Sequence, residues 1–140
     1  MSAPANLNPR RWEEVARWLF RADDDLGLVD TILKQSQPSL FGASLHCQQA
    51  AEKMAKAVLI AFGVSPPRTH DLDELSDRVR AVHAGIGEEV RGLSPLTTWY
   101  VVSRYPDVAT ESHPSVDDVR SALTKLYDLR RKIQSLLPQQ

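Results

Sequence analysis

The residues best placed to act together chemically form a polar strip, which consists of His46, Gln49, Lys53 and Lys56. Their spacing of three, four and three residues brings them onto one side of a helix. Two ammonium groups and an amide can donate hydrogen bonds to phosphate oxygens, and a protonated histidine adds another donor. The strip could equally be a solvated edge, in which Glu52 pairs with Lys56 four residues on. Both interpretations, a phosphate-binding site and a solvated edge, stay open.

A second set of candidate residues lies around Arg104 and Tyr105. Arginine is always charged, and its planar fork matches a phosphate or a carboxylate with two hydrogen bonds. Tyr105, or Tyr100 before it, could stack on a nucleotide base. Alternatively, Arg104 pairs with an acidic residue within Asp23–Asp25. Ligand contact and an internal ion pair are therefore both open roles for this arginine.

Two further polar motifs have structural explanations that we favour. Gln48 lies among apolar positions, where a buried amide must find hydrogen-bond partners. We expect it to bond to another helix or to the backbone of a loop such as 104–107. In Thr69-His70-Asp71, we expect Thr69 or His70 to cap a helix rather than to act in catalysis.

The chain has no pattern typical of a metal or cofactor site. Asp23, Asp24 and Asp25 are consecutive, and consecutive residues of a helix point about 100° apart, so they cannot converge on one ion. The 4 histidines and the single cysteine have no spacing typical of a zinc site. We therefore expect neither a metal nor a cofactor.

Helices must position these side chains, because apolar residues recur at helical spacing along much of the chain. A first helix should run over 9–37, beginning with Asn8 as cap and Pro9 as first helical residue. A second should run over 40–62 with two adjacent apolar stripes, which would place it in the centre of the fold. The apolar stripe of the first helix comprises Trp12, Val15, Leu19, Ala22, Leu26, Val29 and Leu33.

The second half of the chain is less regular. A third helix should begin at Thr69 or His70 and end near Gly85 or Gly87. Within 88–103 the pattern starts as helical, whereas 99–103 has the aromatic and β-branched character of a strand. A capping signature at 115–118 begins a last helix, which ends at Pro138.

The short connections between these helices favour antiparallel neighbours. We therefore expect an all-α fold, an up-down antiparallel bundle of four to five helices. It would form a single domain over residues 9–138, preceded by a disordered lead at 1–8. A chain of 140 residues is long enough for one self-sufficient core.

The composition restricts the classes of partner and compartment. The net charge of −1 gives no overall attraction to nucleic acid, so any site for a polyanion must be a local patch. One cysteine, Cys47, allows no intrachain disulfide and is typical of a reducing compartment. No apolar run reaches the ~20 residues of a membrane span, and residues 1–6 lack the features of a signal peptide. We expect a cytoplasmic protein that does not enter a membrane.

Four segments, taken in order, resemble the HEPN family of small helical domains. The resemblance covers about residues 12–130. Its segments are Ala22-Asp-Asp-Asp-Leu26 in the first helix, His46-Cys-Gln-Gln-Ala-Ala-Glu-Lys53 with Ala55-Lys-Ala57 in the second, Thr69-His-Asp-Leu72 at the start of the third, and Arg104-Tyr-Pro-Asp107 before the last.

This resemblance implies a bundle of four or five helices that usually dimerises. Family members often pair with a minimal nucleotidyltransferase, some as toxin and antitoxin. Many are metal-independent ribonucleases with an arginine, four to six residues, and then a histidine, at a site formed across the dimer. Here eight residues separate Arg104 from His113, and the only formal match, Arg78 and His83, lies within the expected third helix.

Three hypotheses follow from the residues and the resemblance together. The first is a non-catalytic or weakly catalytic homodimer that binds nucleotide or RNA, or that serves as partner subunit of a nucleotidyltransferase. The second is an active metal-independent ribonuclease, in which His113 moves the 2′-hydroxyl proton and Arg104 stabilises the charged phosphorane. The third is an interaction scaffold that binds no small ligand.

Overall fold

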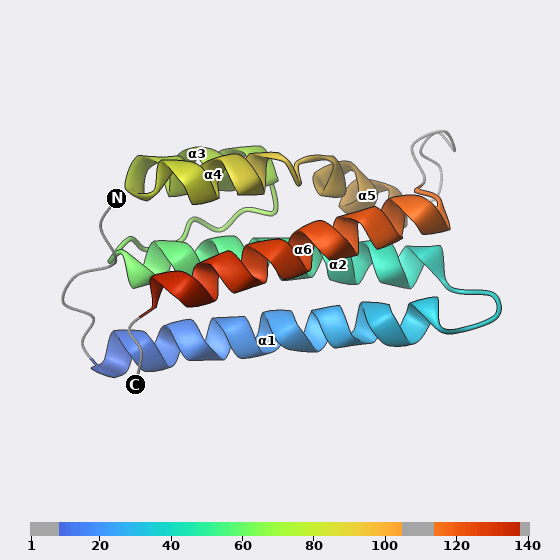
Figure 1. Cartoon of the computed structure of the whole chain (residues 1–140). Helices are drawn as coiled ribbons and strands as arrows, with labels where there is room; N and C mark the ends of the chain where they lie inside the picture. The colour runs from blue at the N-terminus through green and yellow to red at the C-terminus, as the bar shows by residue number, and fades with distance from the viewer. Residues whose placement is uncertain (1–8, 105–113, 138–140) are drawn as a thin grey trace.

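The fold is built from helices alone in the residues that the computed structural model describes, 9–104 and 114–137 (Figure 1). In chain order they are α1 (Pro9–Leu33), α2 (Leu40–Ala61), α3 (Leu72–Val82), α4 (Ala84–Arg91), α5 (Pro95–Arg104) and α6 (Val116–Leu136). The prediction of an all-α bundle is confirmed. The described residues form six helices, because the region expected to hold one or two helices holds three short ones. The lead expected at 1–8 lies outside the described residues.

Helix α2 lies at the centre of the bundle, as its two apolar stripes predicted. It packs against α1, α3, α5 and α6, and Figure 1 shows it between α1 on one side and the short helices on the other. Its small side chains, including Ala50 and Ala57, are fully buried and let neighbouring helices approach closely. Phe41 departs from the prediction, since it begins the second stripe yet is 58% exposed.

The apolar stripe of α1 is buried as predicted. Val15, Leu19, Ala22, Leu26 and Val29 all belong to the core. The stripe packs mainly on α2, and α1 also meets the antiparallel α6, whose last turn lies near the first turn of α1 (Figure 1). The described helices include none that is long and apolar enough to cross a bilayer.

The caps of the long helices follow the sequence signals. Ser39 begins α2, where its hydroxyl accepts a hydrogen bond from the backbone N–H of Gly42 at 3.1 Å. Ser115 begins α6 in a capping box with Asp118, which satisfies two backbone donors reciprocally. Gly63 follows the end of α2 with a φ of 81°. This left-handed conformation is one that glycine adopts without strain.

The cap expected at Thr69 or His70 is wrong by one or two residues. Asp71 is the cap of α3, and its carboxylate accepts from the backbone N–H of Asp73 at 2.9 Å. The Thr69 hydroxyl accepts from the N–H of Asp71 at 3.1 Å instead. Two short polar side chains can each bond two residues ahead here, and only the backbone conformation decides which of them caps the helix.

The third helix ends earlier than the prediction of Gly85 or Gly87. Helix α3 stops at Val82, and His83 both closes it and begins α4. The Nδ1 atom of His83 accepts from the backbone N–H of Ile86 at 3.0 Å, which makes this residue the cap of α4. The chain thereby turns back on itself, and Gly87 of α4 lies directly against the backbone of Arg80 in α3.

Residues 99–103, whose pattern has strand character although the sequence leaves their conformation open, belong to α5. Pro95, expected to interrupt the pattern, is the first residue of this helix, where its missing N–H has no cost. Leu96 and Trp99 are spaced for one helical face, and both pack against the core. The hydroxyl of Thr97 also accepts from the N–H of Leu72 at 3.1 Å. These tertiary contacts outweigh the weak strand propensity.

Candidate functional site

A buried carboxylate, Asp25 of α1, organises half of the polar strip of α2. Asp25 is only 4% exposed. One of its oxygens accepts from Nδ1 of His46 at 2.8 Å, and the other accepts from Nζ of Lys53 at 2.6 Å. Because an ionised carboxylate only accepts, His46 must donate through Nδ1. The three side chains form one ion-paired network between α1 and α2.

This network fixes the chemistry that His46 and Lys53 offer to a ligand. The side chain of His46 is 27% exposed and that of Lys53 is 25% exposed. With Nδ1 donating to Asp25, a neutral His46 has a lone pair on Nε2, and a protonated one has an N–H there. The Lys53 ammonium has further protons besides the one that Asp25 receives. The pair can therefore bind an anion, at the cost of sharing its charge with Asp25.

A second carboxylate, Glu52, holds the other half of the strip. One of its oxygens accepts from Nζ of Lys56 at 2.9 Å, and the other bonds to Nδ1 of His70 at 2.7 Å. The i,i+4 pairing of Glu52 with Lys56, predicted for a solvated edge, is therefore present. The edge is not solvated, because Lys56 is buried and its Nζ lies 6.0 Å from the centre of the Trp18 ring. A cation at this distance from an indole ring is attracted to it, so Lys56 is the member of the strip least available to a ligand.

The two glutamines next to these networks have different surroundings. Gln49 is half-buried on the strip between His46 and Lys53. Gln48 is fully buried, and its amide donates to the backbone carbonyl of His70 at 2.7 Å. The prediction that Gln48 bonds to a loop backbone is confirmed, although the loop is the one before α3 and not 104–107. Its role is to hold that loop against α2.

Burial makes the thiol of Cys47 unreactive. The thiol is fully buried in the core of the bundle. Burial, together with the nearby negative charge of Asp25, raises the pKa of Cys47 to about 12. Because only the thiolate is a good nucleophile, this cysteine acts as a packing residue.

A comparison with protein families identifies the chain. A family model described as the HEPN domain matches residues 15–135. The chain belongs to the HEPN domain family. The match contains all four segments that resembled the family in the sequence, including Ala22–Leu26 and Arg104–Asp107. The comparisons with curated proteins and with solved structures give no match.

Arg104 and His113, the pair considered for ribonuclease activity, have side chains outside the described residues. Arg104 ends α5, and Tyr105 after it also lies outside the described residues. Two of the three acidic residues considered for Arg104 have partners in other elements. Asp25 holds His46 and Lys53, and Asp23 accepts from Arg130 of α6 at 2.7 and 3.0 Å.

The formal arginine–histidine match at Arg78 and His83 is structural in this HEPN domain. His83 is buried, and its Nδ1 is used as the cap of α4. Its ring also makes an edge contact with Phe62, with the ring centroids 6.4 Å apart. Arg78 is exposed on α3. The pair therefore does not form a pocket for a phosphate.

The sequence predicted Glu52 as the partner of Lys56, but it did not reveal the other acceptor, Asp25, or the aromatic ring of Trp18. The sequence suggested Asp25 only as a possible partner of Arg104 within Asp23–Asp25, whereas the structure buries it between His46 and Lys53. The available signal was its spacing of three residues from Ala22 and four from Val29, which places it on the side of α1 that carries the apolar stripe. Trp18 had a similar signal, since it lies three residues after Val15 and four before Ala22. Neither signal predicts which residues of α2 these side chains contact, because those contacts depend on how α1 and α2 align.

Proposed function

We propose that this HEPN protein is a homodimeric, cytoplasmic module that binds a nucleotide or RNA, or that serves as the partner subunit of a minimal nucleotidyltransferase. The observation that carries the proposal is the pair of partly exposed side chains His46 and Lys53, within a chain of the HEPN family. This pair supplies a cation and a ring nitrogen side by side. The separation of Arg104 from His113 by eight residues supports binding over efficient ribonuclease activity.

The proposed binding site uses the polar strip unequally. Lys53 and His46 contact a phosphate, and Gln49 between them adds an amide donor. Lys56 contributes only its charge, since its ammonium is held by Glu52 and Trp18. Arg104 and Tyr105 complete the site in this proposal, as a second phosphate contact and a stacking surface.

Binding of ATP and of a short single-stranded RNA tests this site. We expect Lys53→Gln and His46→Gln each to weaken binding roughly tenfold, because each removes one charge-assisted hydrogen bond. Glutamine retains a donor towards Asp25, so the fold should be preserved. Lys34→Gln is the matched control, since Lys34 is exposed just beyond α1. Calorimetry and fluorescence anisotropy at low and moderate salt would measure the affinities. Equal losses in Lys53→Gln and Lys34→Gln would contradict the proposed site.

One observation favours the scaffold as the second candidate function. His46, Lys53 and Lys56 are each already paired with a carboxylate of the same chain. Under the scaffold hypothesis the wild type binds neither ATP nor RNA, while its protein partner still binds at high salt. The ribonuclease hypothesis is tested by incubating the protein with the same RNA in the presence of EDTA and measuring cleavage. Cleavage that is lost in Arg104→Ala and in His113→Ala would establish the ribonuclease instead.

A further inference from the structure

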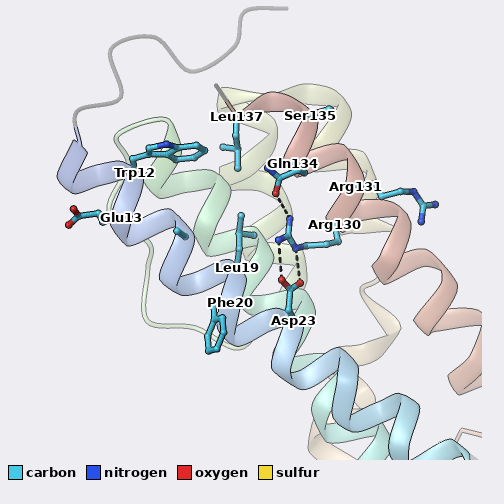
Figure 2. A pocket seen from close by; sticks show the side chains of 11 residues that line it. Trp12, Glu13, Leu19, Phe20, Asp23, Arg130, Arg131, Gln134, Ser135 and Leu137 are labelled. Carbon is cyan, nitrogen blue, oxygen red and sulfur yellow. Dashed lines mark hydrogen bonds and ion pairs between the residues drawn. The ribbon is translucent and has the colours of Figure 1, made fainter. Parts of the chain in front are cut away.

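An open groove of about 870 Å³ lies between the first half of α1 and the last two turns of α6 (Figure 2). Leu19 and Leu137 are buried beneath it. Trp12 lies across one end of the groove, and Phe20 lies along its α1 side. The surface of the groove is mainly apolar, although it lies on the outside of the bundle and six of its eleven lining residues are polar or charged.

Phe20 is the most exposed large apolar residue among those the structure describes, at 73% exposure. It follows Leu19 and points away from the α1–α2 contact, so packing within the chain does not explain it. Single exposed apolar residues are common on protein surfaces. An exposed phenylalanine beside an apolar groove is more informative, because such continuous patches mark interaction surfaces.

Three polar side chains of the groove, Arg130, Asp23 and Gln134, are already bonded to one another. Arg130 reaches across from α6 to Asp23 of α1 through two hydrogen bonds, and it also donates to Gln134 at 2.9 Å. Figure 2 shows this network beside the apolar part of the groove. A partner therefore need not supply a charge inside the groove, which favours an apolar occupant there.

The charges at the two rims have opposite signs. Glu13 is exposed on the α1 rim, and Arg131 is 71% exposed on the α6 rim. Figure 2 shows them on opposite sides of the groove, pointing away from each other. Arg131 also pairs with Asp128 of its own helix, but that exposed pair is weak and leaves other donors of the guanidinium available.

We propose that this groove, with Phe20 at its edge, is the face through which two copies of the chain dimerise. A twofold rotation that brings Glu13 to Arg131 of a second copy necessarily brings Arg131 to Glu13 of that copy as well. The same rotation covers Phe20 and the groove with their own counterparts.

The length of α1 is sufficient for such an interface. The helix has 25 residues. At the helical rise per residue it extends for roughly 37 Å. The groove itself occupies the first half of α1, so an interface of roughly 800 Å² per subunit would continue along the helix beyond it. The inference rests on the proposed function only in taking the protein to be a homodimer.

Sedimentation equilibrium of the full chain tests the surface. We expect a wild-type dimer and a dissociation constant raised at least tenfold by Phe20→Glu, as for the loss of a central aromatic anchor. Phe41→Glu is the matched control, since Phe41 is also an exposed phenylalanine but lies at the start of α2, away from the groove. It should leave the dissociation constant unchanged. Circular dichroism would verify that both variants keep the wild-type helix content.

Charge reversal tests the orientation of the two copies. Glu13→Arg and Arg131→Glu should each weaken the dimer roughly two- to fivefold, as expected for a pair at an interface rim. The double variant should recover the wild-type dissociation constant, because the reversed pairs attract again. If the two substitutions weakened dimerisation independently, so that the double variant dissociated more readily than either single variant, the proposed orientation would be overturned.

Two further outcomes separate this inference from the proposed function. A wild type that is dimeric, with Phe20→Glu dimerising equally well, would overturn the groove as the interface and leave the nucleotide site intact. A wild type that stays monomeric would overturn both this interface and the homodimer of the proposed function. Nucleotide binding by His46 and Lys53, measured separately, would then decide whether the rest of the proposed function stands.

Discussion

At the residue scale, hydrogen bonds between polar side chains join the long helices. Asp25 joins α1 to α2 through His46 and Lys53. Tyr127 of α6 donates its hydroxyl to Asp30 of α1, and burial together with this bond raises the pKa of Tyr127 to about 12. Polar side chains thus align the long helices, whose apolar stripes alone would allow sliding by a turn.

Cys47 gives a prediction about both reactivity and pH. Its pKa lies at about 12 in the folded chain, against an ordinary 9.0. Folding therefore requires the neutral thiol. The contribution of Cys47 to the free energy of unfolding is complete below about pH 9 and decreases as the pH rises from there towards about 12. Iodoacetamide at pH 8 should label the native protein far more slowly than the protein in urea, as mass spectrometry would measure. Equal labelling rates would contradict the buried position.

At the scale of the elements, close contacts between helix backbones decide where the short helices begin and end. Helices α3 and α4 form a tight pair because His83 caps α4 and Gly87 allows the close approach. The sequence predicted that the third helix would continue to Gly85 or Gly87, since Leu75, Val79 and Val82 follow a helical apolar pattern. The turn depends on a histidine used as a cap, which is less common than serine or aspartate in that position.

Gly87→Ala tests this packing. A methyl group at Gly87 would lie 2.6 Å from Cα of Arg80, so α3 and α4 would have to separate. We expect the free energy of unfolding to fall by about 1–3 kcal/mol, as in other cases of overpacking. Gly27→Ala is the control, because no atom lies within 4 Å of the added group. Alanine in the middle of α1 should stabilise the protein by about 0.5–1 kcal/mol. Urea denaturation would measure both values, and similar effects of the two variants would contradict the tight α3–α4 contact.

At the scale of the whole molecule, α2 connects nearly every part of the fold. It packs against α1, α3, α5 and α6, so these elements share one core. Its polar strip faces α1 and the loop before α3, whereas the α1–α6 groove lies on another side of α1. The proposed nucleotide site and the proposed dimer interface therefore use different surfaces of the bundle.

Met54→Ala tests the single core. Met54 is fully buried in the middle of α2, and its truncation should lower the free energy of unfolding by about 2–5 kcal/mol. Because all helices share the core, circular dichroism and tryptophan fluorescence should report the same transition. Since Phe41 is exposed, Phe41→Ala should change stability by no more than about 0.5 kcal/mol. Two separate transitions would show that the short helices unfold independently of α1, α2 and α6.

The sequence by itself determined the long helices and the family. Helical spacing of apolar residues such as Val15, Leu19 and Met54 is a local property, so it predicted α1, α2 and α6 and the central place of α2. Capping residues such as Ser39 and Ser115 act within one turn, and they too were predicted. The strip of His46, Gln49, Lys53 and Lys56 was found because four residues on one helix face need no tertiary information.

Only the tertiary structure decided what those side chains contact. The partners of the strip, Asp25 and Trp18, come from another helix, and their approach depends on how α1 and α2 align across the core. The same holds for α5, whose residues have mixed propensity and become helical through contacts with α2 and α3. The α1–α6 groove joins residues from opposite ends of the chain, and no local pattern encodes such a contact, because it arises only when the bundle closes.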